Sequence, residues 1–402
     1  MSQTWPGGII SKTPPTVVGP TDGEGGSAPG VWTLDQAMGY EKLGQWPKPL
    51  IPKELWSWGS NSYGQLGIGN STNYSSPKQV GALTTWLAIA SGQYHSLSIK
   101  SDGTLWSWGR GIFGILGLGN TTYYSSPKQV GALTTWSTTA GGFYHSIAVK
   151  TDGTLWSWGR SDDGQLGLGN TTYYSSPKQV GALTTWSSIT CGRSSVVATK
   201  TDGTLWSWGH NFWGQLGLGN ITSYSSPKQV GALTTWLTIA CGMYHTLAIK
   251  TDGTLWSWGF NSSGRLGLNN TTSYSSPKQV GALTTWSKIA GGGSNSIALK
   301  TDGALWSWGQ NAFGQLGLGN TTYYSSPKQV GALTTWLAIA SGNSFSLATK
   351  TDGTLWSWGR NNFGQLGLGN TTNYSSPKQV GALTTWLKIA GGYLQSLAIK
   401  RT

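Results

Sequence analysis

LWSWG occupies residues 155–159, and the same five letters begin at 55, 105, 205, 255, 305 and 355. The 13-residue run YSSPKQVGALTTW begins at 74 and returns unchanged every fifty residues through 374. Residues 51–400 are therefore seven copies of one 50-residue unit. A strict period of about 50 indicates a propeller or a solenoid, in which each unit is one supersecondary element packed against its neighbours.

The residues around LWSWG alternate as strands do. In YHSIAVK (144–150), Ser146, Ala148 and Lys150 alternate with the residues between them, which is the period of a strand. Asp152-Gly153 separates this run from the next LWSWG, and Asp-Gly between two strand runs favours a hairpin. No window shows helical periodicity. Four short antiparallel strands in each unit predict one propeller blade.

Tryptophan supplies the core. Each unit holds three, Trp56, Trp58 and Trp86 in the first copy, which gives 21 of the 25 in the chain. One buried aromatic ring removes about 150–250 Å² from water. At about 25 cal/mol per Å², this is several kcal/mol for each ring before entropy is subtracted. The repeat region is therefore predicted to be globular, although the chain holds 61 glycines.

The ends of the repeat region predict a closed ring. The first copy begins inside a blade, at ELWSWG, and the last ends at SLAIK (396–400), the strand that precedes TDG elsewhere. Residues 54–80 and 386–400 should then supply two strands each to one composite blade. Closure removes exposed sheet edges. We therefore predict an all-β, seven-bladed propeller over residues 51–402, preceded by an extended N-terminal arm over residues 1–50.

Charge and cysteine content set bounds on function. The chain carries a formal charge of +13, spread without a Lys/Arg cluster; this fits either a solvated surface or attraction to an acidic partner. Cys191 and Cys241 are the two cysteines, too few for a disulfide framework or a metal cluster. The N-terminus lacks the apolar run of a signal peptide, and no stretch of 18 apolar residues predicts a membrane span.

The pattern DGTLWSWG, then GQLGLGN, then HSLAIK resembles the regulator of chromosome condensation repeat in all seven copies. The resemblance implies a seven-bladed propeller whose blades are shared between sequence repeats. It also implies that members which exchange nucleotide on a small GTPase use an insertion in one blade. Every copy here has 50 residues, and the family histidine is replaced at Ser195, Asn295, Phe345 and Gln395. Exchange activity is therefore not expected.

The copies differ mainly in two loops, which should emerge on one face because consecutive antiparallel strands reverse direction. Unselected drift of exposed loops would give the same location. The enrichment in aromatic, Arg and Asn residues favours recognition. We predict a ligand-binding face made of Tyr63, Tyr94, His95, Arg110, Phe113, Phe143, Tyr144, His145, Arg160, Asp162, Asp163, Arg193, His210, Phe212, Trp213, Met243, Tyr244, His245, Phe260, Phe313, Phe345, Arg360, Phe363 and Tyr393.

Catalytic motifs are not found in the sequence. The repeated Tyr-His-Ser of three units lacks companion carboxylates or cysteines at ligand spacing, and GLGN lacks the Lys-Ser/Thr of a phosphate loop. Asp162 and Asp163 are adjacent carboxylates in one loop and could hold a cation, but the sequence places no further ligand beside them. We therefore expect no enzyme, no catalytic residue, no cofactor and no metal site.

The N-terminal arm is rich in Pro, Gly, Ser and Thr, which favours either a disordered tail or an anchor that orders on docking. The segment SAPGVWTLDQAMGYEKLGQWPKP (27–49) loosely resembles N-terminal stretches of marine bacteriophage virion appendage proteins. That resemblance implies a virion anchor, for which we expect the following residues: Val31, Trp32, Leu34, Tyr40 and Trp46.

The first hypothesis is therefore a non-enzymatic phage virion appendage, a tail or head fibre or decoration, made in the host cytoplasm and located in the virion. Its arm would bind other virion proteins, and its variable face a host-surface glycan or protein. Nucleic acid binding and membrane insertion are not expected, and an oligomer within an assembly is possible. Two alternatives stay open: a chromatin- or small-GTPase-binding regulator of the chromosome-condensation type, and a lectin-like module.

Overall fold

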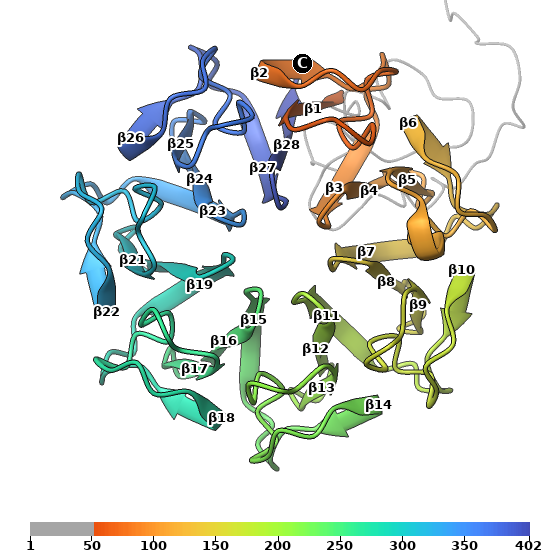
Figure 1. Ribbon diagram of the computed structural model, residues 1–402, viewed down its shortest axis with the longest axis horizontal. Helices are drawn as coiled ribbons and strands as arrows, with labels where there is room; N and C mark the ends of the chain where they lie inside the picture. The colour runs from red at the N-terminus through yellow and green to blue at the C-terminus, as the bar shows by residue number, and fades with distance from the viewer. Residues whose placement is uncertain (1–51) are drawn as a thin grey trace, which may run out of the picture. The chain divides into compact units, whose positions relative to one another are not determined.

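The computed structural model describes residues 52–402, in which residues 54–400 form one compact unit. Seven antiparallel sheets of four strands stand around a central axis (Figure 1). The predicted seven-bladed propeller is confirmed. The anchoring residues Val31, Trp32, Leu34, Tyr40 and Trp46 lie outside the described residues.

Blades 1 to 6 follow one another along the chain, beginning at Trp86. Blade 1 contains β3 (Trp86–Ser91), β4 (His95–Lys100), β5 (Leu105–Gly109) and β6 (Tyr124–Gln129). Blade 2 contains β7 (Trp136–Gly141), β8 (His145–Lys150), β9 (Leu155–Gly159) and β10 (Tyr174–Gln179). Blade 3 contains β11 (Trp186–Cys191), β12 (Ser195–Lys200), β13 (Leu205–Gly209) and β14 (Tyr224–Gln229). Blade 4 contains β15 (Trp236–Cys241), β16 (His245–Lys250), β17 (Leu255–Gly259) and β18 (Tyr274–Gln279).

The remaining blades repeat this order. Blade 5 contains β19 (Trp286–Gly291), β20 (Asn295–Lys300), β21 (Leu305–Gly309) and β22 (Tyr324–Gln329). Blade 6 contains β23 (Trp336–Ser341), β24 (Phe345–Lys350), β25 (Leu355–Gly359) and β26 (Tyr374–Gln379). Blade 7 contains β27 (Trp386–Gly391), β28 (Gln395–Arg401), β1 (Lys53–Gly59) and β2 (Tyr74–Gln79). One 3-10 turn, η1 (Ile112–Gly114), lies in the loop after β5.

Blade 7 joins the two ends of the repeat region, as predicted. Its strand order is β2-β1-β28-β27, so strands from both ends of the chain pair in one sheet. Glu54 takes the place that threonine holds in most copies. Its carboxylate accepts a hydrogen bond from Trp56 Nε1 at 3.0 Å and forms an ion pair with Lys400 at 2.8 Å. The pKa of Glu54 is lowered, because these two contacts outweigh the opposing effect of burial.

The core lies between blades. In blade 1, the second tryptophan of the LWSWG motif is Trp108. It is fully buried and packs edge-on against Trp86, with 6.2 Å between the ring centroids. Its indole N–H donates to the Gln65 carbonyl of blade 7 at 2.9 Å. The equivalent bond recurs around the ring and closes it where Trp58 donates to the Gln365 carbonyl at 2.9 Å. The tryptophans thus fill the interfaces and also link each blade to the one before it.

The TDG turn explains the other tryptophan of LWSWG. In blade 2, Asp152 accepts hydrogen bonds from the backbone N–H and the hydroxyl of Thr154, and Trp156 Nε1 donates to that hydroxyl at 2.9 Å. Blade 5 has Ala304 at this position. There the backbone bond to Asp302 persists, but the Trp306 indole N–H is buried without a partner among the described residues.

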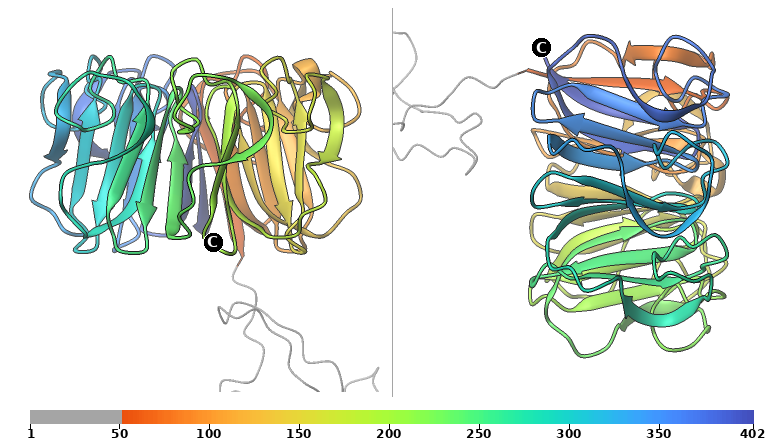
Figure 2. Two further views of the ribbon diagram at one scale, coloured as in Figure 1. Left: turned by 90° about the horizontal axis from the view of Figure 1, so that it is seen from below. Right: turned by 90° about the vertical axis from the view of Figure 1, so that its left-hand side faces the viewer.

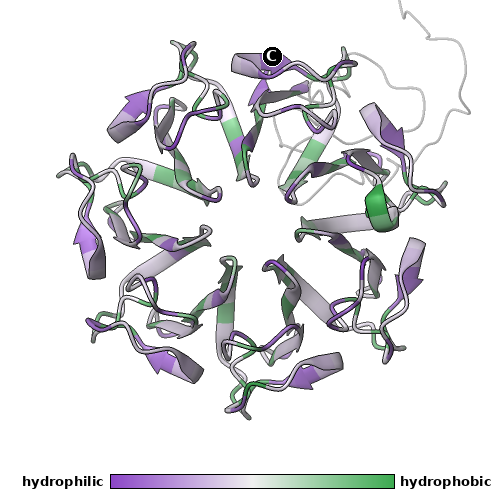
Figure 3. Ribbon diagram, in the orientation of Figure 1, coloured by the Kyte–Doolittle hydropathy of each residue, from purple (hydrophilic) through white to green (hydrophobic). Residues whose placement is uncertain are grey.

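The outermost strands are hydrophilic, in contrast to the inner ones (Figure 3). Each carries an exposed lysine over a tyrosine ring, for example Lys128, whose ammonium lies 5.5 Å from the Tyr124 centroid.

Within residues 52–402, no helix is long and apolar enough to cross a membrane.

The loops separate into two opposite faces (Figure 2). On one, here called the upper face, the loop after β5 begins beside the β3–β4 turn, because the Arg110 N–H donates to the Tyr94 carbonyl at 2.9 Å. On the lower face the TDG turn bonds to the GALTTW connection, through Ser101 N–H to the Thr85 carbonyl at 2.8 Å. The variable loops therefore lie on the upper face, and the near-invariant loops lie on the lower one.

Candidate functional site

Aromatic rings of the upper face contact one another from blade to blade. Tyr94 lies 5.0 Å from Tyr63 and 5.9 Å from Tyr393, measured between ring centroids. Tyr393 in turn lies 5.4 Å from Phe143. Residues from opposite ends of the chain thus meet on one surface, which the closed ring makes possible.

Arginine side chains lie between these rings. Arg110 stacks on Tyr63 at 4.8 Å and on Tyr94 at 5.6 Å, and its Nε donates to the Tyr123 hydroxyl at 3.3 Å. Arg160 lies 5.3 Å from the Phe113 centroid. Cation–π contacts of this kind contribute about 0.5–1 kcal/mol at exposed sites, so they help to hold the guanidinium groups in place.

The same pattern continues across blades 3 and 4. Arg193 lies 5.5 Å from the Phe143 centroid and hydrogen-bonds to the Tyr244 hydroxyl. Tyr244 contacts Phe260 at 6.4 Å, and Phe260 packs against Trp213 at 4.1 Å. We call the exposed and half-buried residues of this connected set the aromatic–arginine network; it comprises Tyr63, Tyr94, Arg110, Phe113, Tyr123, Phe143, Tyr144, Arg160, Tyr173, Arg193, His210, Phe212, Trp213, Tyr244, Phe260 and Tyr393.

Phe113 is held in the network by a strained backbone. Its φ is 60°, in the left-handed region that non-glycine residues rarely adopt. Its ring contacts Tyr144 at 5.6 Å and Tyr173 at 5.4 Å. Such strain costs about 1–3 kcal/mol and is concentrated at functional sites, which supports a binding role for this part of the face.

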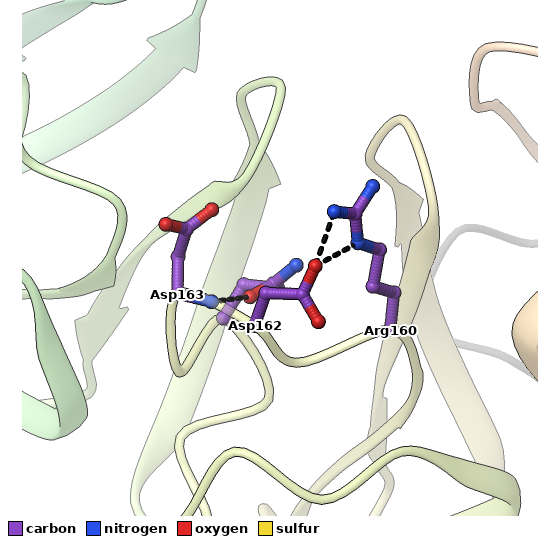
Figure 4. A network of polar contacts seen from close by, with 4 residues as sticks. Arg160, Asp162 and Asp163 are labelled. Carbon is purple, nitrogen blue, oxygen red and sulfur yellow. Dashed lines mark hydrogen bonds and ion pairs between the residues drawn. The ribbon is translucent and has the colours of Figure 1, made fainter.

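A pocket of about 290 Å³ opens within the network, between the upper loops of blades 2, 3 and 4. Its lining combines cationic, anionic and aromatic groups: Tyr144, Arg160, Asp163, Arg193, Ser194, His210, Phe212, Trp213 and Tyr244. Arg160 also forms an ion pair with Asp162 in the same loop (Figure 4). Burial lowers the pKa of His210, Asp163 opposes that shift, and Arg193 adds to it.

Several predicted contact residues are buried instead. His95, His145, His245 and Phe345 are at most 1% exposed and begin strands β4, β8, β16 and β24. They face the space between blades: His95 Nε2 lies 2.9 Å from Ser146 Oγ of the next blade. These four residues support the upper face from beneath and present no contact surface.

The buried histidines are neutral. Burial, with the charge of His145, lowers the pKa of His95 to about 3, and burial lowers that of His145 to about 4. The Ser146 hydroxyl donates to the Ile115 carbonyl at 2.8 Å, so it accepts from His95 Nε2–H. Val196 stands where the partner serine of His145 would be, and both ring nitrogens of His145 are without partners among the described residues.

A second cavity of about 220 Å³ lies on the central axis and is lined by all seven blades. Met243 and both cysteines contribute to its wall. Burial raises the pKa of Cys241 to about 12, and it raises that of Cys191 as well. Both thiols therefore remain protonated and weakly nucleophilic near neutral pH.

Besides Asp162 and Asp163, three predicted residues of the upper loops, Phe313, Arg360 and Phe363, lie outside the network. Arg360 stacks on Phe313 at 5.1 Å as a separate pair, and the Phe363 N–H donates to Gln365 at 2.9 Å.

Two network residues, Tyr123 and Tyr173, were absent from the predicted contact set although their position varies between copies. Arg265 was also missed. It is 3% exposed, and burial lowers its pKa to about 10.

No group of three or more His, Cys, Asp or Glu side chains that could hold a metal occurs in residues 52–402. Asp162 is used instead in the ion pair with Arg160. The upper face is thus a surface of stacked rings and arginines with one mixed-charge pocket, an arrangement suited to recognition.

Comparison with models of known protein families identifies the family of this chain. Residues 136–398 match the model of the RCC1-like domain, which is more than half of the chain. Residues 54–99 and 102–149, and separately 86–115, match models of the regulator of chromosome condensation (RCC1) repeat. The chain belongs to the RCC1-like domain family. No curated protein sequence matches it.

Solved structures share the fold of this RCC1-like propeller. Human WBSCR16 aligns with a TM-score of 0.79 at 21% identity, over 87% of this chain and 99% of that one. Prp20p from Saccharomyces cerevisiae, described with its binding to Gsp1p and histones, aligns with 0.78 at 22%, over 87% and 92%. Yeast RCC1 (Prp20) bound to Kap60 aligns with 0.77 at 21%, over 87% and 89%.

These findings correct the first functional hypothesis. The prediction of a phage virion appendage is wrong, because the family match and the similar structures are RCC1-type propellers. The predicted partners, virion proteins and a host-surface glycan or protein, are wrong on the same ground, since the similar structures are described with Gsp1p, histones and Kap60. The alternative of a condensation-type regulator fits better.

Proposed function

We propose that this chain is a non-enzymatic binding protein of the chromosome-condensation type, which binds chromatin or a small GTPase through the aromatic–arginine network. The observation that carries the proposal is the placement of Arg110, Arg160 and Arg193 between aromatic rings on one face. Arg, Tyr and Trp are the residues enriched at energetic hot spots of protein interfaces.

The charge of the chain supports an acidic contact on the partner. The net charge is +13, and Arg110 and Arg193 form no ion pair with a carboxylate within residues 52–402. Guanidinium groups held by stacking lose little further freedom when they bind a carboxylate or phosphate in a bidentate manner. Binding of the kind described for Prp20p is therefore proposed here without nucleotide exchange, because all seven copies have the same length.

The test compares two triple variants that remove the same charge. R110Q/R160Q/R193Q changes the network, and K128Q/K178Q/K228Q changes exposed lysines on the outermost strands of the same blades. Binding to reconstituted nucleosomes and to small GTPases is measured by biolayer interferometry at fixed ionic strength.

We expect the arginine variant to bind about 100-fold more weakly, a loss of about 2.7 kcal/mol, which is the size of one hot-spot contact. The lysine variant should bind within about threefold of the natural chain, as for peripheral charges. Equal loss in both variants, or no binding of either partner by the natural chain, would overturn the proposal.

A further inference from the structure

The pocket of the upper face has a chemistry that protein contact alone does not require. Its lining residues come from three blades and include the aromatic rings of Tyr144, Phe212, Trp213 and Tyr244. Phe212 is 61% exposed, so one ring offers a free face. Trp213 is packed against Phe260 at 4.1 Å and closes one side. A volume of about 290 Å³ lies just below the range of about 300–1,000 Å³ for small-ligand pockets.

Charged groups of both signs line this pocket. Arg160 is bound to Asp162 through its own loop, whereas the Asp163 carboxylate points away from that pair (Figure 4). The backbone N–H of Asp163 donates to Gln165 at 2.9 Å, which fixes the residue. Within residues 52–402, no side chain forms a hydrogen bond or ion pair with its carboxylate. Asp163 therefore offers a carboxylate acceptor, and Arg193 offers a cation.

We propose that this pocket binds a guanine nucleotide unit. The base stacks on Phe212, its N1–H and N2–H donate to the Asp163 carboxylate, and its phosphate lies beside Arg193. Flipped or unpaired bases are bound in proteins by this combination of aromatic stacking and hydrogen bonds to the Watson–Crick edge. The site goes beyond the proposed protein-binding role and does not depend on it.

The carboxylate decides between the bases. An ionised carboxylate accepts hydrogen bonds and donates none. Guanine presents two adjacent donors on its Watson–Crick edge. Adenine and cytosine each present one amino group beside an acceptor nitrogen, and uracil presents one N–H between two carbonyls. Each of the other three bases would therefore place an acceptor against Asp163, which costs free energy.

The test measures binding of GMP, AMP, CMP and UMP to the full chain by isothermal titration calorimetry. Guanine-containing and guanine-free single-stranded RNA form a second arm. GMP should bind about tenfold more tightly than the other nucleotides, the effect of one bidentate contact. Binding of free GMP identifies a free nucleotide as the source of the base. Binding only of guanine-containing RNA identifies a strand, and both outcomes support the site.

Three variants sharpen the result. D163N should reduce the preference for guanine to within about twofold, because the amide presents a donor as well as an acceptor. R193Q should weaken all four nucleotides about tenfold, as expected for loss of a phosphate contact. R360Q is the matched control: Arg360 occupies the position of Arg160 in another blade, outside the pocket, and should change nothing.

Two results would overturn the site: no saturable binding of any nucleotide or strand, or binding that is indifferent to the base and to D163N. Loss of protein partners in R110Q/R160Q/R193Q, without any guanine binding by the natural chain, would support the protein-binding role alone. Unchanged melting temperatures of all variants show that the comparison concerns binding and not folding.

Discussion

At the scale of single residues, the seven copies act as natural substitution experiments within one fold. Thr154 bridges Asp152 and the Trp156 indole, and the same three-residue chain occurs in most blades. Glu54 replaces the threonine where the ring closes and supplies a carboxylate to the same indole position. Ala304 has no side-chain acceptor for the indole N–H, so the N–H of Trp306 is buried without a partner among the described residues.

Ala304→Thr should therefore stabilise the protein. The equivalent Thr254 and Thr354 are buried and hydrogen-bonded in the neighbouring blades, and a new hydrogen bond contributes about 1 kcal/mol. The free energy of unfolding, measured with urea, should rise by that amount, while Thr254→Ala should lower it. No increase in A304T would contradict this account of the Trp306 N–H.

The buried histidines predict a pH dependence. His95 and His145 have pKa values lowered to about 3 and about 4, and that of His245 is also lowered. The unfolded chain takes up these protons below pH 6.5 and the folded chain does not, so stability is complete above pH 6.5 and is lost as pH falls. Each histidine contributes a slope of about 1.4 kcal/mol per pH unit.

The variant H95N/H145N/H245N, which uses a residue that blade 5 already has at this position, should flatten urea stability between pH 6.5 and 4.5. The pKa values of Asp152 and its equivalents are lowered from 3.8, so these carboxyl groups act mainly below this window. An unchanged slope in the variant would mean that the histidines are protonated in the folded protein.

At the scale of elements, glycines of the loop after each LWSWG let one blade contact the next. Gly217 has a φ of +76°, and a Cβ there would lie 2.6 Å from Trp258 Nε1. Gly231, on the lower face, has a φ of +62° with nothing within 4 Å of such a Cβ. Both substitutions strain the backbone, and one also separates two blades.

Gly217→Ala should thus cost about 3 kcal/mol or more, the sum of left-handed strain and overpacking. Gly231→Ala should cost about 1 kcal/mol, from the strain alone. Equilibrium unfolding of the two variants under one condition measures the difference. Similar losses would mean that the Trp258 indole shifts without cost.

The elements were largely predictable from sequence, because the 50-residue period, the Asp-Gly turns and the alternation in YHSIAVK each depend on local residues. His95 shows the limit. Its variation between copies predicts a place in an exposed turn, but β4 begins at this residue, and its side chain faces the next blade. The contact between Tyr94 and Tyr393 joins residues almost 300 positions apart, and only the closed ring brings them together.

At the scale of the whole molecule, closure through blade 7 was predictable from where the first and last copies begin and end. The direction of the variable loops was also predictable, from the reversal of antiparallel strands. The continuity of the network was not, because sequence variation marks which positions differ and does not show which of them touch. Blades 7 and 1 to 4 carry the connected rings, and Arg360 with Phe313 stands apart.

The central claim is that the upper face, and not the lower one, contacts the partner. Hydrogen-exchange mass spectrometry of the chain bound to nucleosomes or to a small GTPase tests it most directly. We predict protection in the turns around residues 93, 143 and 193 and in the loops 110–123, 160–173 and 210–223, with the TDG turns unchanged. Protection confined to the TDG and GALTTW loops would contradict the account.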